Sequence, residues 1–217
     1  MIDEIKAIAR RHLAADGANL SLRAVARELG VVSSALYRYF ASRDELLTAL
    51  IVDAYNALGD AAEAADAAVA DHADLRGRWL AVCHSARRWA LANPAEYALI
   101  FGSPVPGYAA PQATTEAAAR TPLTLVRIIS DGVQSGVLRE PLGGPDLPAP
   151  VREDIARVRD QIFPGLPEQM LARGTVAWIH IFGAVSFELF GQLNNVIEAR
   201  EAYFEYQMLI MAELIGL

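Results

Sequence analysis

The sequence is poor in cysteine and lacks the long apolar segments that would place it in a membrane. Its 217 residues include a single cysteine, Cys83, so no intramolecular disulfide can form, which favours a reducing compartment. No charged segment followed by an apolar core opens the chain, so we expect no signal peptide. The longest uncharged run, residues 97–115, holds three prolines and two glycines, and the apolar run 174–187 is too short to span a bilayer. We therefore expect a soluble, cytoplasmic protein.

Motifs of catalysis and of metal binding are also missing. The sequence has no Gly-x-Ser-x-Gly element, no phosphate-binding loop and no His-Glu-x-x-His element. Cys83 and His84 are adjacent and would point about 100° apart on a helix. The histidines show no metal-ligand spacing; they are His12, His72, His84 and His180. We expect no metal, no cofactor and no enzymatic activity.

The overall charge is acidic, but the acid is unevenly distributed. The net charge of −7 argues against a general nucleic-acid binder. Residues 1–48 carry seven basic and six acidic groups, a net of +1, so the excess acid lies after residue 48. The amino-terminal segment can therefore still contact phosphate.

Apolar spacing and capping residues predict four helices at the start of the chain. Ser21 is a suitable N-cap, Ser33 or Ser34 can cap a short helix after Gly30, and Ser42 with Glu45 forms a capping box. The predicted helices cover residues 2–15, 22–29, about 33–40, and 42 to about 70.

Two of these helices, joined by a short turn that contains Gly30, have the arrangement of a helix-turn-helix. The second helix of that motif enters the major groove of DNA by its N-terminal residues. Small Ser33 and Ser34 would let the backbone approach base edges, and Leu36 and Phe40 would face inward. Further exposed positions would contact the DNA surface, namely Tyr37, Arg38 and, at the start of the next helix, Arg43.

The remaining sequence predicts helices only, with frequent alanine and no strand pattern. The predicted fold is all-α, with about nine or ten helices, in two domains: an N-terminal helix-turn-helix domain at residues 1–48 and a C-terminal helical domain at residues 49–217. Later helices are predicted at 75–92, from 94 to a loop at 102–111, after that loop to about 135, and, beyond a second loop at 141–150, at 151–161, 167–193 and 197–217.

Residues 22–47 read LRAVARELGVVSSALYRYFASRDELL and resemble the DNA-binding domain of TetR-type transcriptional regulators. The Leu-Tyr-x-Tyr-Phe element followed by a basic residue and Glu-Leu-Leu carries the resemblance, which covers roughly residues 3–50. It implies a C-terminal helical domain that dimerises and binds an inducer. It also implies a set of DNA contacts: Ser21, Arg23, Ser33, Ser34, Tyr37, Arg38, Tyr39 and Arg43.

Residues 178–191, WIHIFGAVSFELFG, resemble a C-terminal subclass of these regulators marked by Trp, His and Gly. Many members carry His directly before the Gly. Here Phe182 stands in that place, and His180 lies two residues earlier.

Aromatic side chains of the second domain could line a cavity or simply pack as core. Pockets between the helices of a bundle are usual sites for ligands. An apolar lining with few polar groups would suit a hydrophobic or aromatic small molecule. The expected lining residues are Trp79, Cys83, Tyr97, Phe101, Trp178 and Phe182.

The last two predicted helices carry more apolar residues than one buried stripe needs. A second copy of the chain would cover the excess, and small residues such as Gly183 would let helices approach closely. Two recognition helices related by a two-fold axis would then read a palindromic operator. The expected interface residues are Ile179, Gly183, Ser186, Phe187, Phe190, Tyr206, Leu209 and Ile210.

The sequence therefore predicts a ligand-responsive homodimeric repressor. Inducer binding would favour a state in which the recognition helices have the wrong spacing, and the helix from Ser42 would link the two domains. Three alternatives stay open: a helical small-molecule-binding protein that no longer reads DNA, an enzyme using His180 or His84, and a transcriptional activator.

Overall fold

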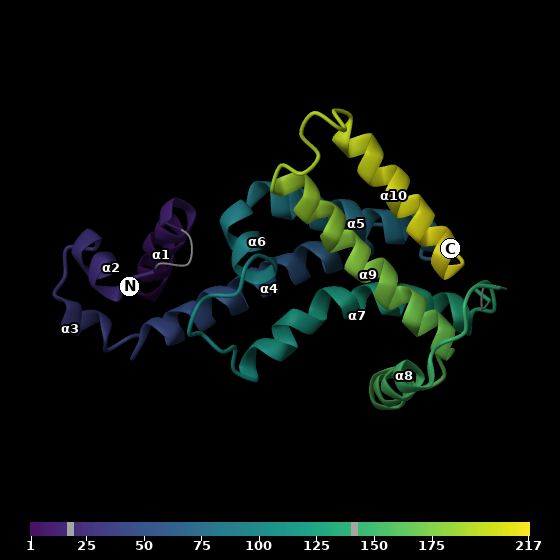
Figure 1. Cartoon of the computed structure of the whole chain (residues 1–217). Helices are drawn as coiled ribbons and strands as arrows, with labels where there is room; N and C mark the ends of the chain where they lie inside the picture. The colour runs from purple at the N-terminus through teal and green to yellow at the C-terminus, as the bar shows by residue number, and fades with distance from the viewer. Residues whose placement is uncertain (17–19, 140–142) are drawn as a thin grey trace. The chain divides into compact units, whose positions relative to one another are not determined.

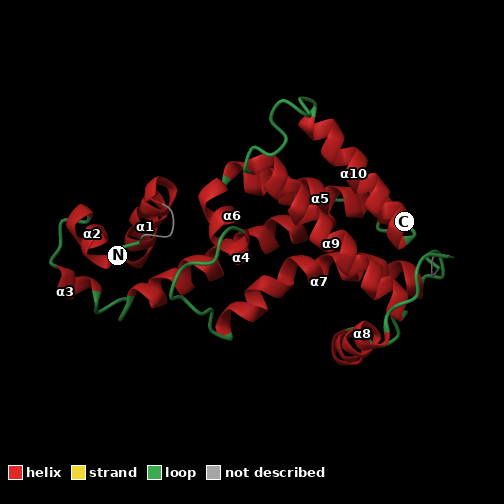
Figure 2. Ribbon diagram, viewed as in Figure 1, coloured by secondary structure: helices red, strands yellow, loops and turns green. Residues whose placement is uncertain are grey.

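The computed structural model describes residues 1–16, 20–139 and 143–217, and those residues contain helices and no strand (Figures 1 and 2). The all-α prediction is confirmed. The helices are α1 (Ile2–Asp16), α2 (Leu22–Glu28), α3 (Ser33–Leu36), α4 (Arg43–Ala67), α5 (Leu75–Ala92), α6 (Pro94–Phe101), α7 (Ala113–Gln134), α8 (Ala149–Ile162), α9 (Glu168–Leu189) and α10 (Arg200–Ile215).

The chain forms two compact units, and neither is continuous in sequence. The first unit comprises residues 1–60 and 88–120, and the second comprises residues 61–87 and 121–217. The unit boundaries fall inside α4, α5 and α7. Each of these helices therefore has one end in the first unit and the other end in the second. The domain boundary predicted after residue 48 stays a prediction.

One hydrophobic cluster of the first unit is built almost wholly from the first fifty residues. Ile5, Val25 and Leu46 have exposed fractions of 0 %, and they belong to one hydrophobic cluster of α1, α2 and the start of α4. Burying a large aliphatic side chain contributes about 1.5–3 kcal/mol, so this cluster holds the short helices together. One buried member, Val105, comes from the segment after α6.

In the second unit, α9 packs against α8 and α10 (Figure 1). Nine residues of α9 are buried, among them Met170, Ala177 and Ile181. Among the described residues, α9 is also the one helix long and apolar enough, by length and composition, to cross a bilayer. Its buried face packs against α8 and α10, as expected for an apolar helix inside a helical domain.

Candidate nucleic-acid interface

The segment from Gly30 to Phe40 presents an exposed polar face above two buried anchors. Gly30 ends the preceding helix with a positive φ of 73°, a conformation that glycine adopts without strain. Leu36 and Phe40 are buried in the core of the first unit, whereas Tyr37 and Tyr39 are 49 % and 42 % exposed. The predicted inward and outward positions of this segment are therefore correct.

The local backbone of this segment differs from the prediction in two respects. The N-cap of α3 is Val32, in extended conformation, and not Ser33 or Ser34. The α-helix ends at Leu36, and residues 37–39 continue as hydrogen-bonded turns up to Phe40. Because the cap lies earlier, Ser33 and Ser34 belong to the first helical turn, and Ser34 is exposed there.

The other predicted contact residues surround this segment. Ser21 is the N-cap of α2 and accepts a hydrogen bond from the backbone N–H of Ala24 at 3.4 Å, as predicted. Arg23 and Arg38 are exposed. Arg43 is half-buried, and its Nε donates to the carbonyl oxygen of Leu20 at 3.1 Å. This bond ties the start of α4 to the residue just before the Ser21 cap.

A charged cluster that the sequence did not predict joins α1 to α2. Arg11 Nη2 lies 2.7 Å from Glu28 Oε1, and His12 Nε2 lies 2.6 Å from Glu28 Oε2. Hydrogen bonds from Arg11 and then from His12 lower the pKa of Glu28. Arg11 and His12 precede Glu28 by 17 and 16 residues, so no local spacing rule would have revealed the cluster.

The start of α4 is capped as the sequence predicts. Ser42 Oγ accepts from the N–H of Glu45 at 3.1 Å, and the Glu45 carboxylate in turn accepts from the backbone N–H of Ala41. These reciprocal bonds satisfy amides that the helix itself leaves unpaired.

The side chains predicted to line a ligand cavity are mostly buried and lie in both units. In the second unit, Trp79 is 0 % exposed and its Nε1 donates to the carbonyl of Met208 at 2.9 Å. Trp178 and Phe182 form an edge contact with ring centroids 6.4 Å apart. Burial raises the pKa of the Cys83 thiol well above its usual range, so this thiol stays protonated.

The two remaining predicted lining residues belong to the first unit. The Tyr97 and Phe101 rings lie 5.1 Å apart on successive turns of α6. Tyr55 meets Phe101 edge-on at 6.1 Å, and burial raises the pKa of Tyr55.

Two cavities of the second unit can be described, and none of the six predicted lining residues borders them. One, of about 570 Å³, lies between residues 143–148 and α9. Arg173 on its wall donates to the carbonyls of Gly143 and Leu214. Leu147 and Val176 give the wall apolar surface.

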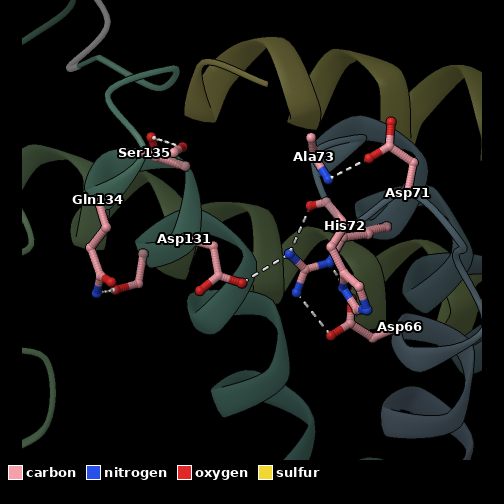
Figure 3. A network of polar contacts seen from close by, with 10 residues as sticks. Asp66, Asp71, His72, Ala73, Asp131, Gln134 and Ser135 are labelled. Atoms are coloured by element: carbon pink, nitrogen blue, oxygen red, sulfur yellow. Dashed lines mark hydrogen bonds and ion pairs between the residues drawn. The ribbon is translucent and has the colours of Figure 1, made fainter.

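The other cavity, of about 450 Å³, borders a buried arginine that the sequence did not single out. Arg78 Nε donates to Asp66 at 2.7 Å, and its Nη1 donates to Asp131 at 2.8 Å and to the carbonyl of His72 at 3.3 Å (Figure 3). The bond with Asp66 is the largest of several effects that raise the pKa of Arg78. This guanidinium joins α4, α5 and α7 within the second unit.

The residues predicted for a dimer interface lie on α9, on α10 and at the C-cap of α9. Ile179, Phe187 and Tyr206 are 60 %, 57 % and 59 % exposed, which is unusual for large apolar side chains. Gly183 is exposed as well, and in the described structure a Cβ built on it would meet no atom within 4 Å. Phe190 and Ile210 are also exposed, while Ser186 and Leu209 are half-buried.

The histidines do not converge on a metal site in the described part of the chain. No group of three or more His, Cys, Asp or Glu side chains there could hold an ion. His180 Nε2 lies 3.1 Å from Gln207 Oε1 and so links α9 to α10. His12 pairs with Glu28.

The amino-terminal geometry is that of a helix-turn-helix protein, and comparison with known proteins supports this class. Residues 5–50 match the profile of the bacterial regulatory proteins of the tetR family, and residues 79–211 match the tetracyclin repressor-like C-terminal domain. The HTH-type transcriptional regulator Rv1816 of Mycobacterium tuberculosis is 42 % identical over 197 residues, which cover 87 % of this chain and 80 % of that protein.

Solved structures agree on the fold. The regulatory protein SCO4313 has a TM-score of 0.79 at 34 % identity, covering 98 % of this chain and 95 % of that one. The TetR family regulator PfmR of Thermus thermophilus has a TM-score of 0.63 at 20 % identity, covering 95 % of this chain and 96 % of that one. The chain belongs to the TetR family of transcriptional regulators. The Trp/His/Gly subclass stays a prediction.

Proposed function

We propose that this TetR-family chain is a cytoplasmic, homodimeric repressor that binds a palindromic operator and is released by a small apolar inducer. The exposed face at Tyr37, Arg38 and Tyr39, held in place by buried Leu36 and Phe40, supports the proposal most directly. Packing explains the two buried residues, but it does not explain two tyrosines and an arginine turned outward. Tyrosine hydroxyls and arginine are suited to phosphate, and aromatic rings are suited to base edges.

The apolar surface of α9 and α10 supports association with a second copy. An exposed patch of this kind is a usual mark of a protein–protein interface. An isologous interface would place two α3 segments about a two-fold axis, and a palindromic site follows from that symmetry.

The cavity beside residues 143–148 supports an apolar inducer. Leu147 and Val176 give its wall apolar surface, which selects ligands by shape and hydrophobicity, and its polar side chains are those of Asp146, Gln169 and Arg173. The predicted lining residues around Trp79 and Trp178 border neither described cavity and stay a prediction. Differential affinity of the inducer for two states of the dimer would shift operator affinity.

A gel-shift experiment with DNA from upstream of the protein's own gene tests operator binding. We expect specific, salt-sensitive binding by the wild type, and loss of specific binding in Tyr37→Ala. Val137→Ala is the matched control, because Val137 is 72 % exposed and lies in the second unit.

If the upstream fragment is not bound, selection from a genomic library extends the test to distant operators. Failure to select any fragment would contradict the proposal and favour a helical ligand-binding protein without operator binding. A reporter fused to a bound fragment then separates repression from activation: deletion of the regulator raises expression for a repressor and lowers it for an activator.

A further inference from the structure

The segment between α6 and α7 completes the core of the DNA-binding helices. Among the described residues, all buried members of that core lie between Ile5 and Leu50 except Val105, which is 9 % exposed. Leu99 and Tyr108 pack against the same cluster and are partly buried. The segment that carries Val105 and Tyr108 lies about 55–60 residues after the first turns of α4. It is therefore part of the packing that holds the helix-turn-helix.

Tyr108 also makes a directed contact with α4. Its hydroxyl oxygen lies 2.9 Å from Thr48 Oγ1, and Thr48 Oγ1 lies 2.8 Å from the carbonyl oxygen of Asp44. A carbonyl can only accept, so the single Thr48 hydroxyl proton points to Asp44. The Tyr108 hydroxyl must then donate to Thr48 Oγ1, and the two bonds form a chain that ends in the first turn of α4.

The tethered part of α4 lies next to the DNA-contact residues. Asp44 follows Arg43, whose Nε binds the carbonyl of Leu20 in front of the Ser21 cap. The start of α4 is thus held from two directions, by the segment before α2 and by the segment after α6. Together these bonds fix where Arg43 and the first amides of α4 lie.

The segment that carries Tyr108 is itself anchored within the first unit. The Tyr108 N–H donates to the carbonyl of Val105 at 3.1 Å, which closes a turn between the two core contacts. At the other end, the Tyr55 hydroxyl donates to the carbonyl of Ile100 at 3.4 Å. Arg10 Nε lies 3.9 Å from Glu96 at the start of α6. The contact with Thr48 is therefore not made by a free loop.

We propose that Tyr108 is a positioning residue for DNA binding: it contacts no DNA, and its hydrogen bond to Thr48 fixes the first turns of α4 against the recognition segment. This inference rests on the proposed operator binding. If it is right, Tyr108 contributes to operator affinity although it lies far outside the helix-turn-helix in the sequence.

The variant Tyr108→Phe removes only the hydroxyl and keeps the ring in the core. We expect operator affinity to fall by about two- to tenfold, the range for one hydrogen bond, at a temperature where both proteins are fully folded. The slope of log affinity against log salt should not change, because no phosphate contact is lost. Tyr203→Phe on α10 is the control, since the described structure gives its hydroxyl no hydrogen bond.

A double-mutant cycle with Thr48→Val tests the pairing itself. Both substitutions break the same bond. The operator affinity of the double variant should therefore be no lower than that of the single variant with the lower affinity. Additive losses, or wild-type affinity in Tyr108→Phe, would overturn the inference while leaving operator binding intact.

Hydrogen exchange supplies a readout that does not need DNA. In Tyr108→Phe, the amides of residues 46–49 should exchange faster than in the wild type, with the rest of α4 unchanged. If exchange is unaltered, Tyr108 does not hold α4. If amide exchange rises in Tyr108→Phe while the wild type binds no DNA, Tyr108 does hold α4, but the proposed operator binding and the role of Tyr108 in it are wrong.

Discussion

Arg87 and Glu188 form a two-pronged ion pair inside the second unit, with Nε and Nη2 of the arginine each 2.7 Å from a carboxylate oxygen. Both residues are 8 % exposed, and the guanidinium lies 5.8 Å from the Phe204 ring centroid. The hydrogen bonds to Glu188 raise the pKa of Arg87, so the guanidinium stays charged in the folded state. One contact thus joins α5, α9 and α10.

Removing one partner of this pair should be costly. In Glu188→Ala the arginine keeps its charge without a partner, and we expect the free energy of unfolding to fall by about 3–5 kcal/mol. Urea denaturation at one fixed protein concentration measures it. Arg157→Ala, which breaks an exposed pair with Asp154, should cost less than about 1 kcal/mol. If the free energy of unfolding falls equally in the two variants, the buried pair stabilises the fold no more than the exposed pair does.

The exposed Arg38 should contribute charge rather than sequence discrimination. If its guanidinium contacts a phosphate, Arg38→Ala weakens binding to all DNA fragments alike and makes the salt slope shallower by about 0.9 per subunit. Titrations at several salt concentrations give the slope. Arg152→Ala, on exposed α8 surface, is the control. An unchanged slope would remove Arg38 from the list of phosphate contacts.

The apolar face of α9 should govern oligomeric state. In Phe187→Glu a charge replaces a ring that is 57 % exposed and belongs to the proposed interface. We expect dimerisation to weaken by more than about 2 kcal/mol, roughly 30-fold in the dissociation constant. Sedimentation analysis measures this, with Val158→Glu on α8 as the control. A dimer that survives Phe187→Glu and dissociates in Val158→Glu would place the interface on α8.

Glu28 should make the amino-terminal helices sensitive to acid. Its pKa is lowered below the usual 4.5 by Arg11 and His12, so its contribution to stability is present above that value and is lost as the pH falls through the folded-state pKa. Glu28→Gln cannot titrate. The melting temperature of the wild type should therefore fall more than that of Glu28→Gln between about pH 6 and pH 3.5. Parallel curves would contradict the linkage.

Local signals were enough to predict most of the helices. Sequence predicts α5 at residues 75–92, as observed, because its apolar spacing and the following Asn-Pro both mark its end. The inward positions of Leu36 and Phe40 follow equally from their spacing. The preference for serine as N-cap was misleading at Ser33. The N-cap of α3 is the extended Val32, so the helix begins at Ser33 itself.

Contacts between distant residues could not be predicted in the same way. Glu188 is 101 residues from Arg87 and stands in an apolar run, where it shows no sign of a partner. Val105 lies in a segment of prolines and glycines with no periodicity, so nothing local marks it as a core residue. The expected DNA-contact residues could be named from the sequence because their motif is compact.

The contribution of Val105 to the amino-terminal core has a consequence for biosynthesis. A ribosome makes the chain from its first residue, and the helix-turn-helix is complete as sequence long before Val105 is added. Its last buried side chain is supplied only after α4, α5 and α6 have all been translated. We therefore expect the core of the nascent helix-turn-helix to stay incomplete until Val105 has been synthesised.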